Sequence, residues 1–192
     1  DKAKVEGVDS TMELYPYPSG STVPLYFLPG YFHEDGPDAM LARLKDEDEV
    51  KKLADFIDDN YDDRVEDAVF SHVPSEKNRH LEGRSFADVA SERGISRGKL
   101  ICQILLEEDL AVCFRGAPPK DTATWRQIDS DTIDLLSRPD YMVGSDSIPL
   151  GSLPHPRAYG TFPRVLGRLR RRSSALSLED LVQRVTDNPA SR

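Results

Sequence analysis

Short apolar segments with strand character alternate with helical segments along this chain, and no other feature restricts its fold as much. Residues 10–17 (STMELYPY) and 141–144 (YMVG) predict buried strands, and residues 67–73 and 110–114 predict two further short strands. Strands that alternate with helices usually pair in parallel, because each helix carries the chain back across the sheet. The sequence therefore predicts an α/β fold with parallel strand pairing.

The helices between these strands are predicted from capping residues and from apolar spacing. Caps are found at Ser85 (with Asp88, before a stop at Gly94), at Ser96 and at Ser177 (with Asp180). Helical apolar spacing is found at residues 40–44 and again at 50–57, and residues 129–136 predict a further short helix. A charged helix at the start of the chain is expected to end at Gly7. Residues 18–38 form a Pro/Gly/aromatic segment much longer than an ordinary connection, which is typical of a lid or a binding surface.

The net charge of −9 has a local origin. Residues 34–67 contain 14 acidic and 5 basic residues, and the rest of the chain is balanced. The simplest interpretation is a solvated helical face. An acidic surface of this kind argues against nucleic acid as a partner. The short Arg-rich run at residues 164–172 is expected to complement carbonyl groups and the acidic surface rather than to bind phosphate.

Length and cysteine content favour an ordinary cytoplasmic domain. A chain of 192 residues is long enough for one domain with an elaboration. It has no apolar run of the roughly 20 residues that a membrane span needs, and no secretory signal is visible. Cys102 and Cys113 have neither disulfide-framework nor zinc-knuckle spacing, and Cys102 is expected in the core. Because the chain begins without an initiator Met, we expect it to be part of something larger.

An aspartate ends the second predicted inner strand. Asp146 follows residues 141–144 directly after Ser145, and the next twenty residues have no helical or strand periodicity. An acid just past the carboxyl end of a parallel strand is where α/β barrels keep their chemistry, either as a metal ligand or as a proton acceptor. An aspartate here could equally cap the next turn, so two interpretations are open at this point.

The loop after Asp146 also contains His155 and Arg157, each flanked by proline. The planar guanidinium of arginine recognises carboxylates with two parallel hydrogen bonds, whereas a lone loop histidine is more often a surface residue. At the end of the first strand, Tyr15 and Tyr17 offer phenol hydroxyl groups, and further donors follow at Ser19, Ser21 and Thr22. The prolines alone could also explain a rigid turn at this place.

Three blocks taken together resemble one family. They are ELYPYPSGST (13–22), LEGRSFADVASERG (81–94) and MVGSD…HPRAYGTFPRVLGR…LSLEDLVQRVTDNPASR (142–192). In this order they are similar to the N-acyl-D-amino-acid deacylases (D-aminoacylases) of the amidohydrolase superfamily. The resemblance implies a metal-dependent (β/α)8 TIM barrel in which zinc activates water to cleave the amide of an N-acyl-D-amino acid.

The resemblance also implies individual roles. Asp146 matches the family's aspartate after the last barrel strand, which binds or faces the metal and acts as general base. Arg157 matches the arginine that holds the substrate α-carboxylate, and Tyr15 and Ser21 match substrate-binding residues, with a one-step uncertainty of register between Tyr15 and Tyr17. His155 lies in the same motif, and residues 23–80 resemble an insertion that covers the active site.

The family's other metal ligands have no counterpart in this sequence. The chain contains four His and no His-x-His, and it begins about where the seventh barrel strand should be. We therefore expect the carboxyl-terminal part of such a barrel, incomplete here, inactive alone, and inclined to self-associate or to pair with the rest of the barrel. Two alternatives stay open: a dihydroorotase-like or cyclic-amidase-like amidohydrolase, and a non-catalytic acidic interaction domain in which Asp146 and Arg157 point away from each other.

Overall fold

The structure is a computed structural model that describes residues 2–192, and the chain within it divides into two compact units. Unit 1 consists of the described residues up to Pro18 together with Pro118–Ser147 and Pro156–Arg192. Unit 2 consists of Ser19–Ala117 and Ile148–His155. The predicted insertion at residues 23–80 falls inside unit 2.

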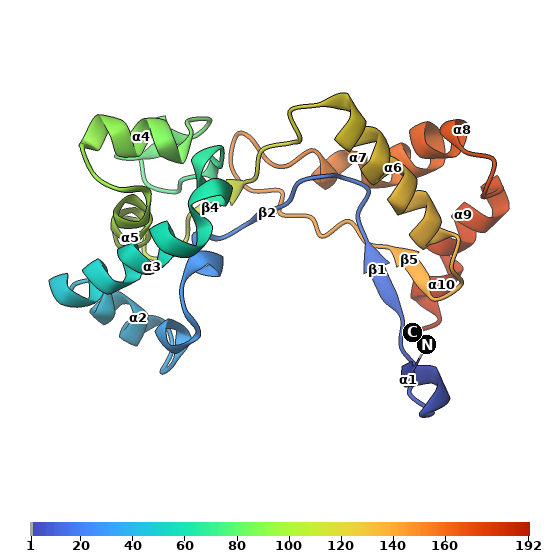
Figure 1. The fold of residues 1–192 in the computed structure, drawn as a ribbon, viewed down its shortest axis with the longest axis horizontal. Coiled ribbons are helices and arrows are strands. Elements are labelled where there is room, and N and C mark those ends of the chain that lie inside the picture. The colour runs from blue at the N-terminus through green and yellow to red at the C-terminus, as the bar shows by residue number, and fades with distance from the viewer. Residues whose placement is uncertain (1) are drawn as a thin grey trace. The chain divides into compact units, whose positions relative to one another are not determined.

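Unit 1 is built on two strands and the helices that follow them. β1 (Met12–Leu14) and β5 (Tyr141–Val143) pair in parallel and lie side by side (Figure 1). The helices of this unit are α1 (Lys2–Val5), α6 (Thr122–Leu136), α7 (Arg157–Pro163), the π-helical η4 (Arg164–Leu169), α8 (Arg170–Arg172), α9 (Leu178–Val185) and α10 (Asp187–Ala190). A small core joins α6, β5, η4 and α9, through Ile133, Leu136, Val143, Val165, Leu169 and Leu181.

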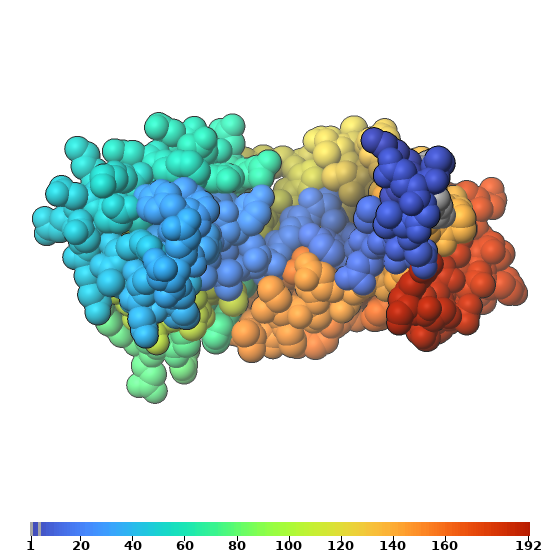
Figure 2. Space-filling view, turned by 90° about the horizontal axis from the view of Figure 1, so that it is seen from below, coloured from blue at the N-terminus to red at the C-terminus, as the bar shows by residue number. Residues whose placement is uncertain are grey.

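Unit 2 combines helices with a small antiparallel sheet of strand order β2-β4-β3. The strands are β2 (Ser21–Thr22), β3 (Val69–His72) and β4 (Cys113–Arg115). The helices are η1 (Pro24–Phe27), η2 (Gly30–His33), α2 (Pro37–Arg43), α3 (Glu47–Glu66), η3 (Arg79–Leu81), α4 (Phe86–Arg93) and α5 (Arg97–Glu107). Residues 34–67, light blue to cyan, cover much of the visible face of this unit, so the acidic window is a helical surface (Figure 2).

The main core lies in unit 2 and centres on the packing of α3 against α5. Leu53 and Ile57 of α3 are buried together with Leu100 and Ile104 of α5, which confirms the predicted apolar faces. Cys102 is buried in the same core, as predicted, and burial raises the pKa of its thiol to about 12. At neutral pH this thiol is therefore protonated and unreactive.

Capping residues predicted the helix ends correctly. Ser85 accepts a hydrogen bond from the amide of Asp88, and α4 ends at Gly94 in the left-handed conformation. Ser96 caps α5 in the same way. Ser177 and Asp180 form a complete reciprocal capping box at the start of α9. These ends are local, because each cap satisfies amide groups within the next turn of the same chain.

The strand predictions were less accurate. The first strand is three residues long instead of eight, and Met12 is 54% exposed because β1 has β5 as its one neighbour among the described residues. The expectation of parallel pairing holds for β1 and β5 but is wrong for the sheet of unit 2. Short strands can pair in either direction, and the tertiary structure decides which. The predicted long loop at residues 18–38 contains β2, η1 and η2.

Two further helices differ from the prediction at their start. α6 begins at Thr122, because Asp121 caps it by accepting a hydrogen bond from the amide of Thr124. α7 begins inside the segment predicted to be irregular, and helical structure continues through η4 and α8 to Arg172. Pro163 lies inside this run and has no amide hydrogen to donate. The loss of that hydrogen bond explains why the turns after Pro163 widen into a π-helix.

The buried Glu108 makes unit 2 sensitive to acid. Its carboxylate accepts hydrogen bonds from the amide and hydroxyl of Ser75 (2.9 and 2.6 Å) and from the side chain of Asn78 (2.6 Å). Burial opposes ionisation of Glu108, but these hydrogen bonds outweigh it and hold the carboxyl pKa below its ordinary value of 4.5. A lowered folded-state pKa stabilises the fold above the unfolded-state pKa, and this stability is lost as the pH falls through the folded-state value.

We therefore expect the free energy of unfolding to fall between about pH 6 and pH 3, and to fall less in Glu108→Gln than in the wild type. Urea titrations across this pH range, monitored by circular dichroism, measure how the free energy of unfolding changes with pH in both proteins. Glu92→Gln, at an exposed carboxylate of the neighbouring α4, is the control and should keep the wild-type slope. If the free energy of unfolding changes with pH equally in the wild type and in Glu108→Gln, Glu108 is not the cause of the acid sensitivity.

Candidate active site

The carboxyl ends of β1 and β5 meet at one edge of unit 1. Leu14 pairs with Val143, and the amide of Gly144 donates a hydrogen bond to the carbonyl of Leu14 (3.1 Å). Tyr15 leaves this edge directly after β1, and Asp146 follows β5 after two further residues. Two of the predicted site residues therefore come from neighbouring strand ends, where α/β barrels carry their reactive groups.

Asp146 occupies an unusual backbone conformation, with a φ of +45°. L-residues rarely adopt this left-handed region, although aspartate and asparagine tolerate it better than most. Strained backbone of this kind tends to occur at functional sites. The Asp146 side chain is 59% exposed, and its Oδ2 lies 2.8 Å from the guanidinium Nη1 of Arg157.

Arg157 is the first residue of α7, and its side chain is 1% exposed. The guanidinium carbon lies 4.4 Å from the centre of the Tyr15 ring, which places the cation over the aromatic face. A buried guanidinium requires a counter-charge, and Asp146 provides one while Tyr15 adds a cation–π contact. The guanidinium of Arg157, which lies on the Tyr15 ring, is thus a charged donor group beside the accessible carboxylate of Asp146. Arg157 and Tyr15 together are called the clamp below.

The structure therefore brings Asp146, Arg157 and Tyr15 together. The non-catalytic alternative required Asp146 and Arg157 to point away from each other, and they are instead in direct contact. The sequence placed Arg157 in an irregular loop, and this was wrong because α7 begins at that residue. The clamp arginine is thus held on a helix, which fixes its backbone more firmly than a loop would.

Ser21 and His155 belong to unit 2. Ser21 is buried in β2 and its hydroxyl donates to the carbonyl of Phe114 on β4 (2.8 Å), so it has a structural function in the sheet. His155 is 3% exposed, and its Nε2 lies within hydrogen-bond distance of the hydroxyl of Ser19 (3.1 Å). Substrate binding by these two residues stays a prediction.

The segment between Asp146 and Arg157 is tied down within unit 2. The Glu82 carboxylate accepts hydrogen bonds from the hydroxyl and amide of Ser152 and from the amide of Val73. Burial opposes ionisation of Glu82, yet these hydrogen bonds hold its pKa below the ordinary value. At Gly151 (φ +79°) a methyl group would overlap the backbone of Ser71. The segment therefore has little freedom where it contacts β3.

A metal site does not form from the described residues alone. Within residues 2–192, no group of three or more His, Cys, Asp or Glu side chains is arranged to hold a metal ion. Asp146, the predicted ligand, is paired with Arg157. The predicted role of Asp146 as a metal ligand stays a prediction.

Asp129 was not among the predicted residues; it is buried in unit 1 and contacted by several arginines of the Arg-rich run. The expected partners of this run were carbonyl groups and the acidic surface at residues 34–67, whereas Asp129 lies outside that window. A signal was present in the sequence: Asp129 shares a helical face with Ile133 and Leu136, four and seven residues further on, where an apolar residue is expected.

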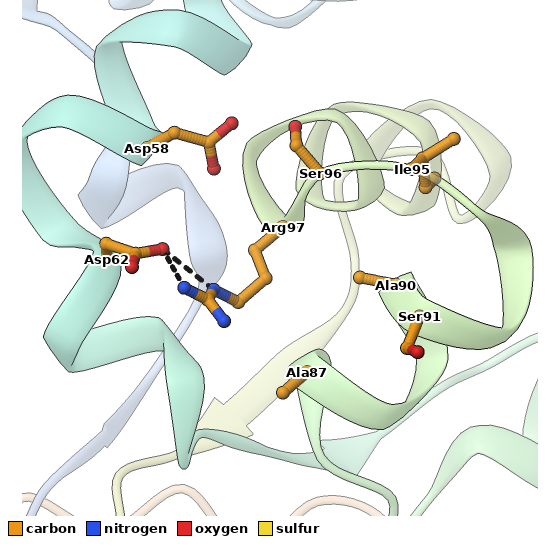
Figure 3. A pocket seen from close by; sticks show the side chains of 8 residues that line it. All are labelled: Asp58, Asp62, Ala87, Ala90, Ser91, Ile95, Ser96 and Arg97. Atoms are coloured by element: carbon orange, nitrogen blue, oxygen red, sulfur yellow. Dashed lines mark hydrogen bonds and ion pairs between the residues drawn. The ribbon is translucent and has the colours of Figure 1, made fainter.

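An open cavity of about 310 Å³ lies in unit 2 between α3, α4 and α5 (Figure 3). Its carboxylates already have partners, because Asp62 pairs with Arg97 and Asp58 accepts the amide of Gly98. None of the predicted site residues lines it. Among the helices of residues 2–192, moreover, none combines the length and the apolarity of a transmembrane span.

Comparison with known proteins points to one group of enzymes, although no family model matches the chain. An N-acyl-D-glutamate deacylase of Alcaligenes xylosoxydans xylosoxydans is 26% identical over 190 residues, which is 99% of this chain and 29% of that protein. A D-aminoacylase from the same organism is 35% identical over 112 residues, or 58% of this chain and 20% of that protein. The chain thus spans less than a third of the length of these relatives.

Solved structures give the same result. The N-acyl-D-glutamate deacylase of Bordetella bronchiseptica, complexed with zinc and a phosphonate inhibitor, matches with a TM-score of 0.60 at 25% identity. The match covers 100% of this chain and 30% of that enzyme. A D-aminoacylase described as defining a novel subset of amidohydrolases matches with a TM-score of 0.59 at 24% identity, which supports the fold alone.

By fold, then, this chain resembles part of the N-acyl-D-glutamate deacylase and D-aminoacylase structures. In sequence the correspondence narrows to the N-acyl-D-amino-acid deacylases, so the predicted family resemblance is confirmed. The α/β class is confirmed as well. The expectation that this chain is a portion of a (β/α)8 barrel stays a prediction, because the described residues contain two parallel strands.

Proposed function

We propose that this chain is the carboxyl-terminal part of a zinc-dependent hydrolase that cleaves N-acyl-D-amino acids to a carboxylate and a free D-amino acid. In this proposal the two parallel strands are the last two of a (β/α)8 barrel, and residues 23–80 are an insertion that covers the active site. The observation that carries the proposal is the contact between Asp146 and Arg157 beside Tyr15, at the carboxyl ends of adjacent strands.

Arg157 would hold the α-carboxylate of the substrate. Its planar fork suits two parallel hydrogen bonds to a carboxylate, and the Tyr15 ring restricts the plane in which the guanidinium can lie. Asp146 already contacts the same guanidinium, so an arriving substrate carboxylate would compete with Asp146 for it. Ser21 and His155 are proposed as further substrate-binding residues.

Asp146 would act as the proton carrier. Released from Arg157, its half-exposed carboxylate can accept a proton from the water that attacks the acyl carbon. When the C–N bond breaks, the same proton passes to the departing nitrogen, which leaves as the free amine. Asp146 would also supply one carboxylate ligand to zinc, whose other ligands lie outside the described residues.

Both cysteines are free and buried, which supports a cytoplasmic location.

Stereospecific hydrolysis tests the proposal. We expect the natural full-length protein, loaded with zinc, to release amine from N-acetyl-D-glutamate or another N-acetyl-D-amino acid and not from the L-enantiomer. We expect residues 1–192 alone to be inactive. Arg157→Lys should raise KM about a hundredfold, because lysine keeps the charge but loses the planar fork. Hydrolysis of dihydroorotate in place of every N-acetyl-D-amino acid would instead favour a cyclic amidase.

A further inference from the structure

Asp129 is a buried acid with more arginine partners than its single charge requires. Its side chain is 8% exposed and contacts Arg164, Arg172 (2.9 Å) and, at 4.0 Å, Arg168. Arg168 and Arg172 are half-exposed, whereas Arg164 is buried, with 9% of its side chain exposed. A buried guanidinium needs a paired carboxylate, which Asp129 supplies, and the further contacts of Arg164 show what this buried pair holds in place.

Arg164 joins Asp129 to the backbone that follows β1. Its Nε donates to the carbonyl of Pro16 while its Nη2 pairs with Asp129. The guanidinium carbon lies 5.1 Å from the centre of the Tyr17 ring and 5.7 Å from that of Trp125. Pro16 is itself buried, and its ring fixes φ, so a hydrogen bond to its carbonyl restrains both neighbouring residues.

Both neighbours of Pro16, Tyr15 and Tyr17, contact α7. Tyr15 lies against the guanidinium of Arg157, as described above. The Tyr17 hydroxyl lies so close to Gly160, three residues further along α7, that a methyl group at Gly160 would overlap it. The segment 15–17 is therefore held by Arg164 on one side and contacts the first turn of α7 at two points. All of these contacts lie within unit 1.

We propose that Asp129 and Arg164 are positioning residues for the clamp. Asp129 fixes Arg164, which fixes the segment 15–17, and this segment fixes the guanidinium of Arg157. The physical coupling follows from the contacts in unit 1; its effect on substrate rests on the proposed function. A group held in place before the substrate arrives loses less freedom on binding, so a remote acid of this kind contributes to affinity without touching the substrate.

The side-chain Nε–H signal of Arg157 in a ¹⁵N-correlated NMR spectrum of this chain tests the coupling directly. The signal is assigned by its loss in Arg157→Lys. We expect Asp129→Asn to move it and to speed its exchange with water about tenfold, because the restraint on segment 15–17 is loosened. Asp140→Asn, which removes a carboxylate of unit 1 paired with Arg138 (2.9 Å), is the matched control and should leave the signal in place.

Trp125 is the single tryptophan of the chain, so its fluorescence reports whether the network itself has changed. A shift of Trp125 emission in Asp129→Asn with an unmoved Arg157 signal would overturn the proposal. If Asp129→Asn fails to fold, Arg164→Lys replaces it. Lysine keeps the charge beside Asp129 but loses the planar contact with Tyr17, and the same change at Arg157 is expected.

Kinetics of the natural full-length protein separate this inference from the proposed function. We expect Asp129→Asn to raise KM for the N-acetyl-D-amino acid about tenfold with kcat within about threefold of wild type, since a substrate-holding group is displaced. A raised KM in Arg157→Lys with an unchanged KM in Asp129→Asn would contradict the positioning role of Asp129 but not the proposed function. Unchanged KM in both, together with a moved Arg157 signal, would support the coupling and refute the proposed function.

Discussion

Asp146→Asn in the natural full-length protein is expected to lower kcat for N-acetyl-D-amino acids about a thousandfold. Loss of a positioned proton acceptor typically costs 10²–10⁴-fold in rate, and asparagine cannot take up the proton. Asparagine is the appropriate replacement because it also tolerates the left-handed backbone at this position (φ +45°), so the fold should be retained. KM should not rise, because the substrate carboxylate no longer competes with Asp146 for Arg157.

The contrast with Arg157→Lys makes this prediction specific. That variant is expected to raise KM, whereas Asp146→Asn is expected to lower kcat. Steady-state kinetics of both variants and of the control Asp140→Asn give the comparison, with circular dichroism as the check on folding. A kcat within tenfold of wild type in Asp146→Asn would show that Asp146 is not the proton carrier.

Gly98→Ala is expected to lower the free energy of unfolding by about 3 kcal/mol, near the upper end of the usual cost of overpacking. Gly98 lies in the first turn of α5, and a methyl group there would overlap the backbone carbonyl of Ala54 on α3. Neither backbone can move without disturbing the central packing of unit 2. Alanine is intrinsically the better helix former by about 1 kcal/mol, but the overlap outweighs this gain.

Urea unfolding followed by circular dichroism measures the effect. Gly30→Ala is the matched control, because Gly30 also lies in unit 2 and no atom approaches the position of its added methyl group. A loss of less than about 0.5 kcal/mol in Gly98→Ala would mean that α3 and α5 can separate easily, which is unusual for a closely packed interior.

Helices whose ends are marked locally could be predicted from the sequence. The caps at Ser85, Ser96 and Ser177 placed three helices correctly, because each cap acts within one turn of the chain. The start of α7 at Arg157 could not be predicted in this way. Gly160 and Pro163 weaken the helical pattern, and the buried Arg157 at the start of α7 is held by its contacts with Tyr15 and Asp146.

The candidate site divides in the same manner. Asp146, Arg157 and Tyr15 could be singled out from residue type, from their position after apolar strands and from the family resemblance. Their contact could not, because it depends on the parallel register of β1 with β5 across more than a hundred residues. Asp129 was missed for a related reason: its environment is made by arginines that approach from a different part of the chain.

The sequence by itself determined the helix caps, the acidic window, the α/β class and the resemblance to the N-acyl-D-amino-acid deacylases, because these depend on neighbouring residues and on residue identity. The tertiary structure alone decided the direction of the sheet in unit 2, the helical setting of Arg157 and its pairing with Asp146. Those features are contacts between distant segments, and their energies arise only when folding brings the partners together and removes them from water.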